Sequence, residues 1–175
     1  MLRSLLKNPV VRFLLTILVL YILWYLIYDL WLHPNETIDL WVIDLTIFLS
    51  RFILEHLGYT VFTGAERLIG VDGTGGLWIG DNCNGITLFA RFAIFILAYR
   101  GLIRTKIIFV FLGILSLELL NVIRVTVLAI LDTHSRTWTE FNHTYTFNIL
   151  IYAYIFSLWM LWVNKYAVTK PVITT

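Results

Sequence analysis

The stretch "FLLTILVLYILWYLIYDLWL", residues 13–32, decides the class of fold. An α-helix of this length, with its rise of about 1.5 Å per residue, crosses the hydrocarbon core of a bilayer, which is about 30 Å thick. Arg3, Lys7 and Arg12 precede the stretch, and no small-residue cleavage site follows it. We therefore predict a retained transmembrane helix rather than a signal peptide, ended by the sequence "HPNET".

The rest of the chain is also apolar. Hydrophobic residues make up 59% of the 175 residues, aromatic residues make up 16%, and the mean hydropathy is +0.83. In a soluble domain only about 45–50% of residues are apolar. Further apolar runs predict transmembrane helices at residues 83–99, 107–131 and 145–163. We expect an all-α integral membrane protein with about four transmembrane helices, in which residues 1–175 form a single domain.

Residues 38–57 predict a different kind of helix. Asp44, Arg51 and Glu55 fall on one stripe at helical spacing, and Arg51 can pair with Glu55. An amphipathic helix lying on the outer membrane surface accounts for this stripe. The alternative is a span whose polar stripe faces the bundle, but that would place the basic loop at residues 100–106 outside, against the positive-inside rule.

Residues 59–80 contain short β-like runs around Asp72 and Gly73, which predicts a small hairpin-like outer segment. The charges predict the orientation of the whole chain. The predicted inner segments carry bases and no acid: Arg3, Lys7, Arg12, Arg100, Arg104, Lys106, Lys165 and Lys170. The predicted outer segments are rich in acids: Glu36, Asp39, Asp44, Glu55, Glu66, Asp72, Asp81, Asp132 and Glu140. A multi-pass protein of the inner or plasma membrane, with both termini cytoplasmic, follows.

Cys83 is the only cysteine, and it precedes an apolar run that spans the bilayer only if its helix begins near Asn82. This places Cys83 in the first turn of that helix, at the outer membrane boundary. His143 precedes the last predicted span on the same side. Arg124 lies about 10 Å below the outer end of its helix, with Asn121 one turn deeper on nearly the same face.

A thiol, an imidazole and a guanidinium thus converge on one membrane face. In acyl transfer a thiolate attacks, an imidazole moves the proton, and a fixed cation stabilises the oxyanion. The ordinary alternatives are a packed thiol at Cys83, an exposed loop histidine at His143, and an Arg124 side chain that reaches the outer headgroups. Asp81 is a candidate to orient His143, but we leave it out of the primary catalytic set.

Two other charges lie within predicted spans. Unpaired, Arg91 and Glu118 would be costly in hydrocarbon, so we predict that both face the bundle and pair with each other. His33, His56 and His134 lack the spacing of metal ligands, so we predict no metal site and no cofactor. The bases fit a membrane topology better than nucleic-acid binding.

Three short motifs carry a resemblance to a known family: "CNGI" at residues 83–86, "NVIR" at 121–124 and "NHTY" at 142–145. Their order resembles that of the exosortase/archaeosortase family of integral-membrane cysteine transpeptidases, and the chain is most similar to the short, stand-alone exosortase X-type members. The resemblance covers about residues 80–163. Asn84 departs from the small residue, commonly serine, that usually follows the cysteine.

The resemblance implies a protease and transpeptidase that cuts the carboxy-terminal sorting signals of secreted proteins through a Cys83 thioester. Such a signal consists of a short motif, a transmembrane helix and a basic cluster, and the cut protein passes to an amine acceptor. The implied catalytic residues are Cys83 as nucleophile, His143 as general base and then acid, and Arg124 as the group that positions the scissile carbonyl or stabilises its oxyanion.

A second function class stays open. The chain would then be a non-catalytic scaffold subunit of a surface-polysaccharide or secretion assembly, with Cys83 a packed thiol and Arg124 a structural charge. The two classes predict different reactivity of Cys83 toward a membrane-impermeant thiol reagent. A small transporter is disfavoured because the ionisable residues thin out toward the cytoplasmic halves of the spans.

Overall fold

The computed structural model describes residues 8–64 and 67–167, so Arg3, Lys7, Glu66 and Lys170 of the predicted charge map lie outside the described residues. The chain is mostly helical, and the prediction of an all-α membrane fold is confirmed. The helical elements are α2 (Pro9–Trp24), η1 (Tyr25–Leu32), η2 (His33–Asn35), α3 (Thr37–His56), η3 (Asp81–Cys83), α4 (Ile86–Ala98), α5 (Ile103–Asp132), α6 (Arg136–Phe141), η4 (Asn142–Thr146), α7 (Phe147–Leu161) and η5 (Trp162–Tyr166).

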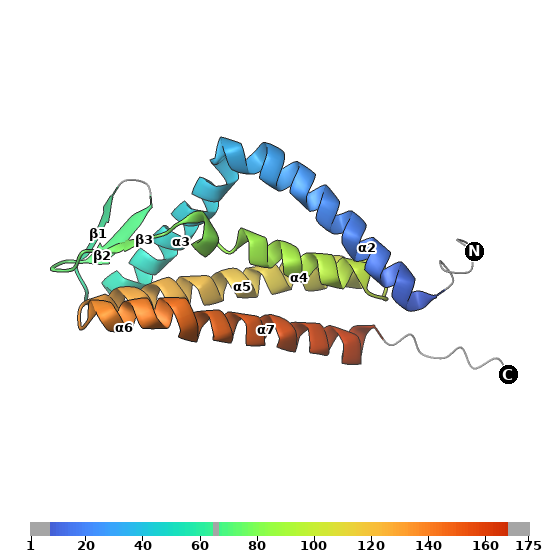
Figure 1. Ribbon diagram of the computed structural model, residues 1–175. Helices are drawn as coiled ribbons and strands as arrows, with labels where there is room; N and C mark the ends of the chain where they lie inside the picture. Colours follow the sequence, from blue (N-terminus) through green and yellow to red (C-terminus); the bar gives the residue numbers. More distant parts are fainter. Residues whose placement is uncertain (1–7, 65–66, 168–175) are drawn as a thin grey trace.

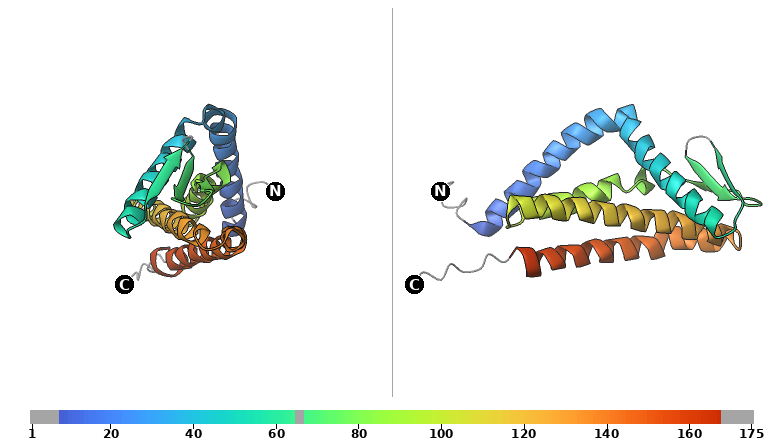
Figure 2. Two further views of the ribbon diagram at one scale, coloured as in Figure 1. Left: turned by 90° about the vertical axis from the view of Figure 1, so that its left-hand side faces the viewer. Right: turned by 180° about the vertical axis from the view of Figure 1, so that it is seen from behind.

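Helices α4, α5 and α7 lie side by side, and α2 rises obliquely from one end of this bundle to an elbow (Figures 1 and 2). From the elbow, α3 runs back to the bundle, packs against α5 and leads into a small sheet. The start of α2, the turn between α4 and α5, and the end of η5 lie at one end of the molecule, called here the basic end. The sheet and α6 lie at the opposite end, called here the sheet end.

Within residues 8–64 and 67–167, three helical stretches are long and apolar enough to cross a membrane: Pro9–Asn35, Ile103–Asp132 and Arg136–Tyr166. They contain the spans predicted at residues 13–32, 107–131 and 145–163. The sequence "HPNET" ends the first of them as predicted, because Glu36 adopts a left-handed conformation with φ of 52°.

The fourth predicted span, residues 83–99, is shorter than expected. Its helix α4 has 13 residues, about 20 Å of rise, and begins only at Ile86. Gly85 precedes it with φ of 81°, and the Asn84 side-chain oxygen accepts a hydrogen bond from the Ile86 N–H at 3.0 Å. This Asx-type cap starts the helix after the cysteine. The prediction that Cys83 occupies the first helical turn is therefore wrong, since Cys83 ends the separate turn η3.

The predicted amphipathic helix at residues 38–57 is α3. Its Asp44, Arg51 and Glu55 are exposed, and Arg51 Nε donates to Glu55 Oε1 at 2.7 Å as predicted. The opposite face packs against α5, where the Thr46 hydroxyl donates to Glu118 Oε1 at 2.7 Å. This polar contact fixes the height of α3 along the bundle.

The hairpin-like segment at residues 59–80 is a three-stranded antiparallel sheet, ordered β1 (Val61–Gly64), β2 (Leu68–Val71) and β3 (Leu77–Trp78). The predicted turn connects β2 to β3, with Gly73 at φ of 88° and the Thr74 N–H donating to the Val71 carbonyl at 3.1 Å. The sheet packs on α3 and α5 through one apolar cluster: Ile43, Leu54, Ile69, Val71, Ile79, Val125 and Ala129.

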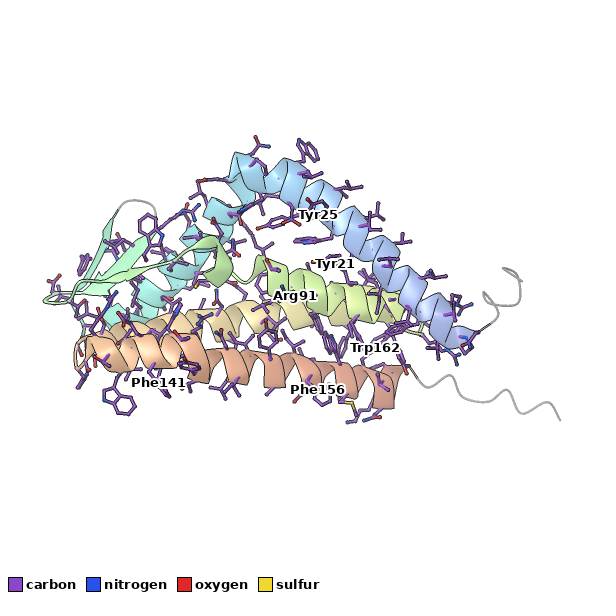
Figure 3. The ribbon with its side chains drawn as sticks, viewed as in Figure 1. Tyr21, Tyr25, Arg91, Phe141, Phe156 and Trp162 are labelled. Atoms are coloured by element: carbon purple, nitrogen blue, oxygen red, sulfur yellow. The ribbon has the colours of Figure 1, made fainter. Side chains whose placement is uncertain are left out.

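The basic end has its own aromatic core. Phe92 and Trp162 are fully buried, and Figure 3 shows Trp162 turned into the bundle, whereas Phe141 and Phe156 lie on its outside. A side chain at Gly113 would overlap the Phe92 ring, so a glycine is required there. Four of the predicted inner bases are exposed at this end: Arg12, Arg100, Arg104 and Lys165.

Candidate active site

The structure brings Cys83, Arg124 and His143 together beside strand β3. Cys83 ends η3, Arg124 lies on α5 and His143 lies on η4. The Sγ atom of Cys83 is 3.2 Å from Nε2 of His143. A terminal nitrogen of Arg124 is 4.0 Å from the same Sγ and 3.5 Å from the main-chain carbonyl oxygen of His143. All three residues proposed from the sequence thus lie within one small volume.

A cavity of about 40 Å³ adjoins the thiol. Part of its wall is apolar and comes from β3, α5 and the residue after β3: Leu77, Trp78, Ile79, Val125 and Leu128. The polar part of its wall is formed by Cys83, Asn121, Arg124 and His143. This volume has room for little more than a water molecule, so a substrate carbonyl enters only a narrow space next to the sulfur.

Arg124 is only 5% exposed, and none of the described carboxylates pairs with it. Its contacts at 3.5 and 4.0 Å are long for hydrogen bonds that a guanidinium donates. It also lines a second cavity of about 290 Å³ between α4 and α7. A buried cation whose donors are not consumed by a carboxylate can stabilise negative charge that develops on a substrate oxygen.

Asn121, one turn from Arg124 on α5, contacts the backbone of the nucleophile. Its amide nitrogen donates to the main-chain carbonyl of Cys83 at 3.2 Å. The Cys83 N–H in turn donates to the Gly80 carbonyl at 2.8 Å. The backbone on both sides of the thiol is therefore fixed.

A second polar cluster, not predicted from the sequence, lies beside the thiol. Asp39 is fully buried and accepts hydrogen bonds at 2.5 Å from the Tyr28 hydroxyl and from Nδ2 of Asn84. His33 Nδ1 lies 3.2 Å from its other oxygen. Helical spacing is the feature of the sequence that could have predicted the burial of Asp39. Asp39 lies four residues before Ile43, so it falls on the buried face of α3 rather than on its charged stripe.

Asp81 does not orient His143 in the structure. It pairs with Arg67, whose other terminal nitrogen donates to Glu36 at 3.2 Å. The hydrogen bond to Asp81 raises the pKa of the Arg67 guanidinium. The nucleophile turn is thus tied to the sheet through Asp81 and to the α2–α3 elbow through Asn84.

The predicted pair of Arg91 and Glu118 is wrong. Glu118 is buried as expected, but its partner is Thr46 on α3. Arg91, labelled on α4 in Figure 3, is exposed and donates to the Tyr152 hydroxyl on α7 at 3.1 Å. The two residues face different neighbouring helices, which their positions in the sequence alone do not reveal.

The family model described as a transmembrane exosortase matches residues 4–163, which is most of the chain and includes all three motifs quoted above. No curated protein and no solved structure matches the chain.

Proposed function

The chain belongs to the transmembrane exosortase family, and we propose that it is a membrane cysteine transpeptidase that cuts the carboxy-terminal sorting signals of secreted proteins. One observation carries this proposal: the Cys83 sulfur is 3.2 Å from His143 Nε2, with the Arg124 guanidinium at 4.0 Å on the same sulfur. Thiol, base and cation have the arrangement that acyl transfer needs.

In the first half-reaction, His143 Nε2 takes the thiol proton while Cys83 Sγ bonds to the scissile carbonyl carbon. The carbonyl oxygen becomes an oxyanion, and the Arg124 guanidinium donates to it. His143 then gives its proton to the leaving amine as the peptide bond breaks. The product is a thioester between Cys83 and the new carboxy terminus.

In the second half-reaction, an amine acceptor attacks the thioester carbonyl and His143 Nε2 takes the acceptor's proton. Collapse of the oxyanion breaks the carbon–sulfur bond, and the proton returns to the Cys83 thiolate. The protein is then joined to the acceptor by an amide bond. Water in place of the amine gives simple hydrolysis.

We further propose an orientation of the chain in the membrane. The basic end carries Arg12, Arg100, Arg104 and Lys165, so by the positive-inside rule we assign it to the cytoplasm. The sheet end, and with it the site beside β3, then faces outward. A substrate held by its own transmembrane helix presents its scissile bond near the outer surface, at the depth of Cys83.

The test is mass spectrometry of the carboxy termini of secreted, helix-tailed proteins in the native host, with wild-type enzyme and with Cys83→Ala. We expect trimming to be lost in the variant although the enzyme is still present in the membrane. The matched control is Arg51→Ala, which alters an exposed pair on α3 and leaves trimming unchanged. Unchanged termini in the Cys83→Ala strain contradict the proposal and favour a scaffold role.

A further inference from the structure

The sheet has a free edge next to the nucleophile. In the order β1–β2–β3, the last strand pairs with β2 on one side, and no other strand of the described residues pairs with its second side. An edge strand exposes main-chain N–H and C=O groups that another extended segment can pair with. The β3 edge is short, since the strand consists of Leu77 and Trp78.

The register shows which of these groups are free. The Ile79 N–H donates to the Arg67 carbonyl at 2.8 Å, and Leu77 is the register partner of Ile69. In an antiparallel pair, hydrogen-bonded and non-hydrogen-bonded positions alternate. Trp78, opposite Leu68, therefore directs its N–H and C=O away from β2, toward the open edge.

The β3 edge lies close to the Cys83 thiol. Leu77, Trp78 and Ile79 line the cavity that adjoins Cys83, and Arg124 and His143 line the same cavity. The chain then runs from Ile79 through η3 directly to Cys83. The Ile79 side chain is buried in the sheet core, whereas the Trp78 side chain is 60% exposed and offers an apolar surface beside the edge.

We infer that the β3 edge is the docking site for the polypeptide that is cut: an extended substrate segment adds to the sheet beside β3, pairing with the N–H and C=O of Trp78. This inference rests on the proposed function and adds to it the place and conformation of the substrate backbone. Main-chain pairing supplies affinity that is independent of sequence, and the exposed indole contacts one neighbouring side chain. The paired segment delivers its scissile carbonyl into the cavity beside Cys83.

Two variants at one position separate the backbone from the side chain. Trp78→Ala removes the indole but keeps the N–H, whereas Trp78→Pro removes both. The sheet tolerates the proline because the lost N–H points away from β2. We expect Trp78→Pro to raise the KM for trimming about 5- to 10-fold above that of Trp78→Ala, as the loss of one hydrogen bond predicts. The substrate is a protein whose carboxy terminus changes in the Cys83→Ala strain, and enzyme and substrate are assayed in native membranes.

Cys83 is the only cysteine, so its alkylation rate reports on the site without any substrate. Alkylation of both Trp78 variants at the wild-type rate shows that their sites are intact. If Trp78→Pro fails to accumulate, the second measurement is the hydrogen-exchange rate of the Trp78 amide in Cys83→Ala enzyme. We expect this amide to exchange more slowly when the untrimmed protein is bound. If the Trp78 amide instead exchanges more slowly as enzyme concentration rises, with no substrate present, a second copy of this chain occupies the edge. That result overturns the inference.

The outcomes separate this inference from the proposed function. Cysteine-dependent trimming with equal KM values for Trp78→Pro and Trp78→Ala overturns the edge pairing and leaves the function standing. Trimming that does not depend on Cys83 at all overturns the function, and the inference with it.

Discussion

Neighbouring residues Cys83 and Asn84 belong to two polar clusters of different character. Asn84 joins the Asp39 cluster, in which the carboxylate is fully buried and two of its three contacts measure 2.5 Å. Cys83 joins His143 and Arg124, with contacts of 3.2, 3.5 and 4.0 Å beside a cavity. One cluster is closed and tightly bonded, and the other is open and loosely bonded.

The difference separates framework from chemistry. A buried polar network with all its partners rigidifies the elements it joins, here the α2–α3 elbow and the nucleophile turn. Groups that act on a substrate need hydrogen-bond donors and space that the protein itself does not fill, and their contacts tighten only when the substrate is present. Substitutions in the closed cluster should therefore affect folding first, whereas those in the open cluster should affect rate first.

The largest effect is expected at His143. In His143→Gln the side chain keeps a similar size but can no longer exchange a proton with Cys83 Sγ. We expect the trimming rate to fall about 1000-fold, the contribution of a general base and acid. The free energy of unfolding in detergent should be unchanged, because among the described residues the His143 side chain makes a single hydrogen bond, to Cys83 Sγ. A comparable loss of stability would place His143 in the framework instead.

The closed cluster should respond in the opposite way. Asn84→Asp brings a second carboxylate against the buried Asp39, now 2.5 Å from the amide nitrogen of Asn84. We expect the free energy of unfolding to fall by about 3 kcal/mol, as for other buried unpaired charges. Thermal unfolding in detergent micelles measures this.

The reciprocal swap tests whether the pair itself matters. Asp39→Asn combined with Asn84→Asp restores one carboxylate and one amide, and should recover most of the lost stability. Asp44→Asn, on the exposed face of the same helix, is the matched control and should be neutral. A double variant no more stable than Asn84→Asp alone argues against direct coupling.

Arg124 should show a somewhat smaller effect on rate. Arg124→Gln removes the cation beside the thiol, and we expect kcat to fall about 100-fold, as on removal of an oxyanion donor. Arg124→Lys keeps the charge but loses the planar donor set, so its kcat should lie between those of wild type and Arg124→Gln. A change confined to KM would instead indicate a role in substrate binding alone.

The smallest effect is expected on the outer face of α3. Arg51 and Glu55 pair at 2.7 Å, but both side chains are nearly half exposed. Arg51→Ala should lower the free energy of unfolding by about 0.3–0.5 kcal/mol, as usual for exposed pairs one helical turn apart. An effect above 1 kcal/mol would show that this stripe is covered in the membrane.

Much of this arrangement could be predicted from the sequence. Length and hydropathy gave the long helices, and the stripe of Asp44, Arg51 and Glu55 gave the amphipathic α3. Topology alone predicts that Cys83, Arg124 and His143 lie toward one face, because Cys83 and His143 precede spans on that side and Arg124 lies about 10 Å from the outer end of its helix. Topology cannot give distances, and only the fold shows that the three residues meet.

The remaining features depend on rotation of helices about their axes and on local caps. Whether Glu118 meets Arg91 or Thr46 depends on which face of α5 turns toward α3. Hydropathy does not determine this, because the buried and the exposed faces of α5 both carry many apolar residues. The late start of α4 depends on the conformation of Gly85 and on the bond between Asn84 and Ile86. The charge map places Asp39 with the outer acids, because an acid is seldom buried without partners. Its partners Tyr28 and Asn84 come from segments outside α3.

Trapping of the covalent intermediate tests the central claim most directly. Hydroxylamine intercepts a thioester, so native membranes supplied with it should yield secreted proteins that end in a hydroxamate at the cleavage site. Mass spectrometry of these carboxy termini should find the hydroxamate with wild-type enzyme and not with Cys83→Ala. Wild-type membranes that continue to trim the protein without ever forming a hydroxamate would contradict catalysis through a Cys83 thioester.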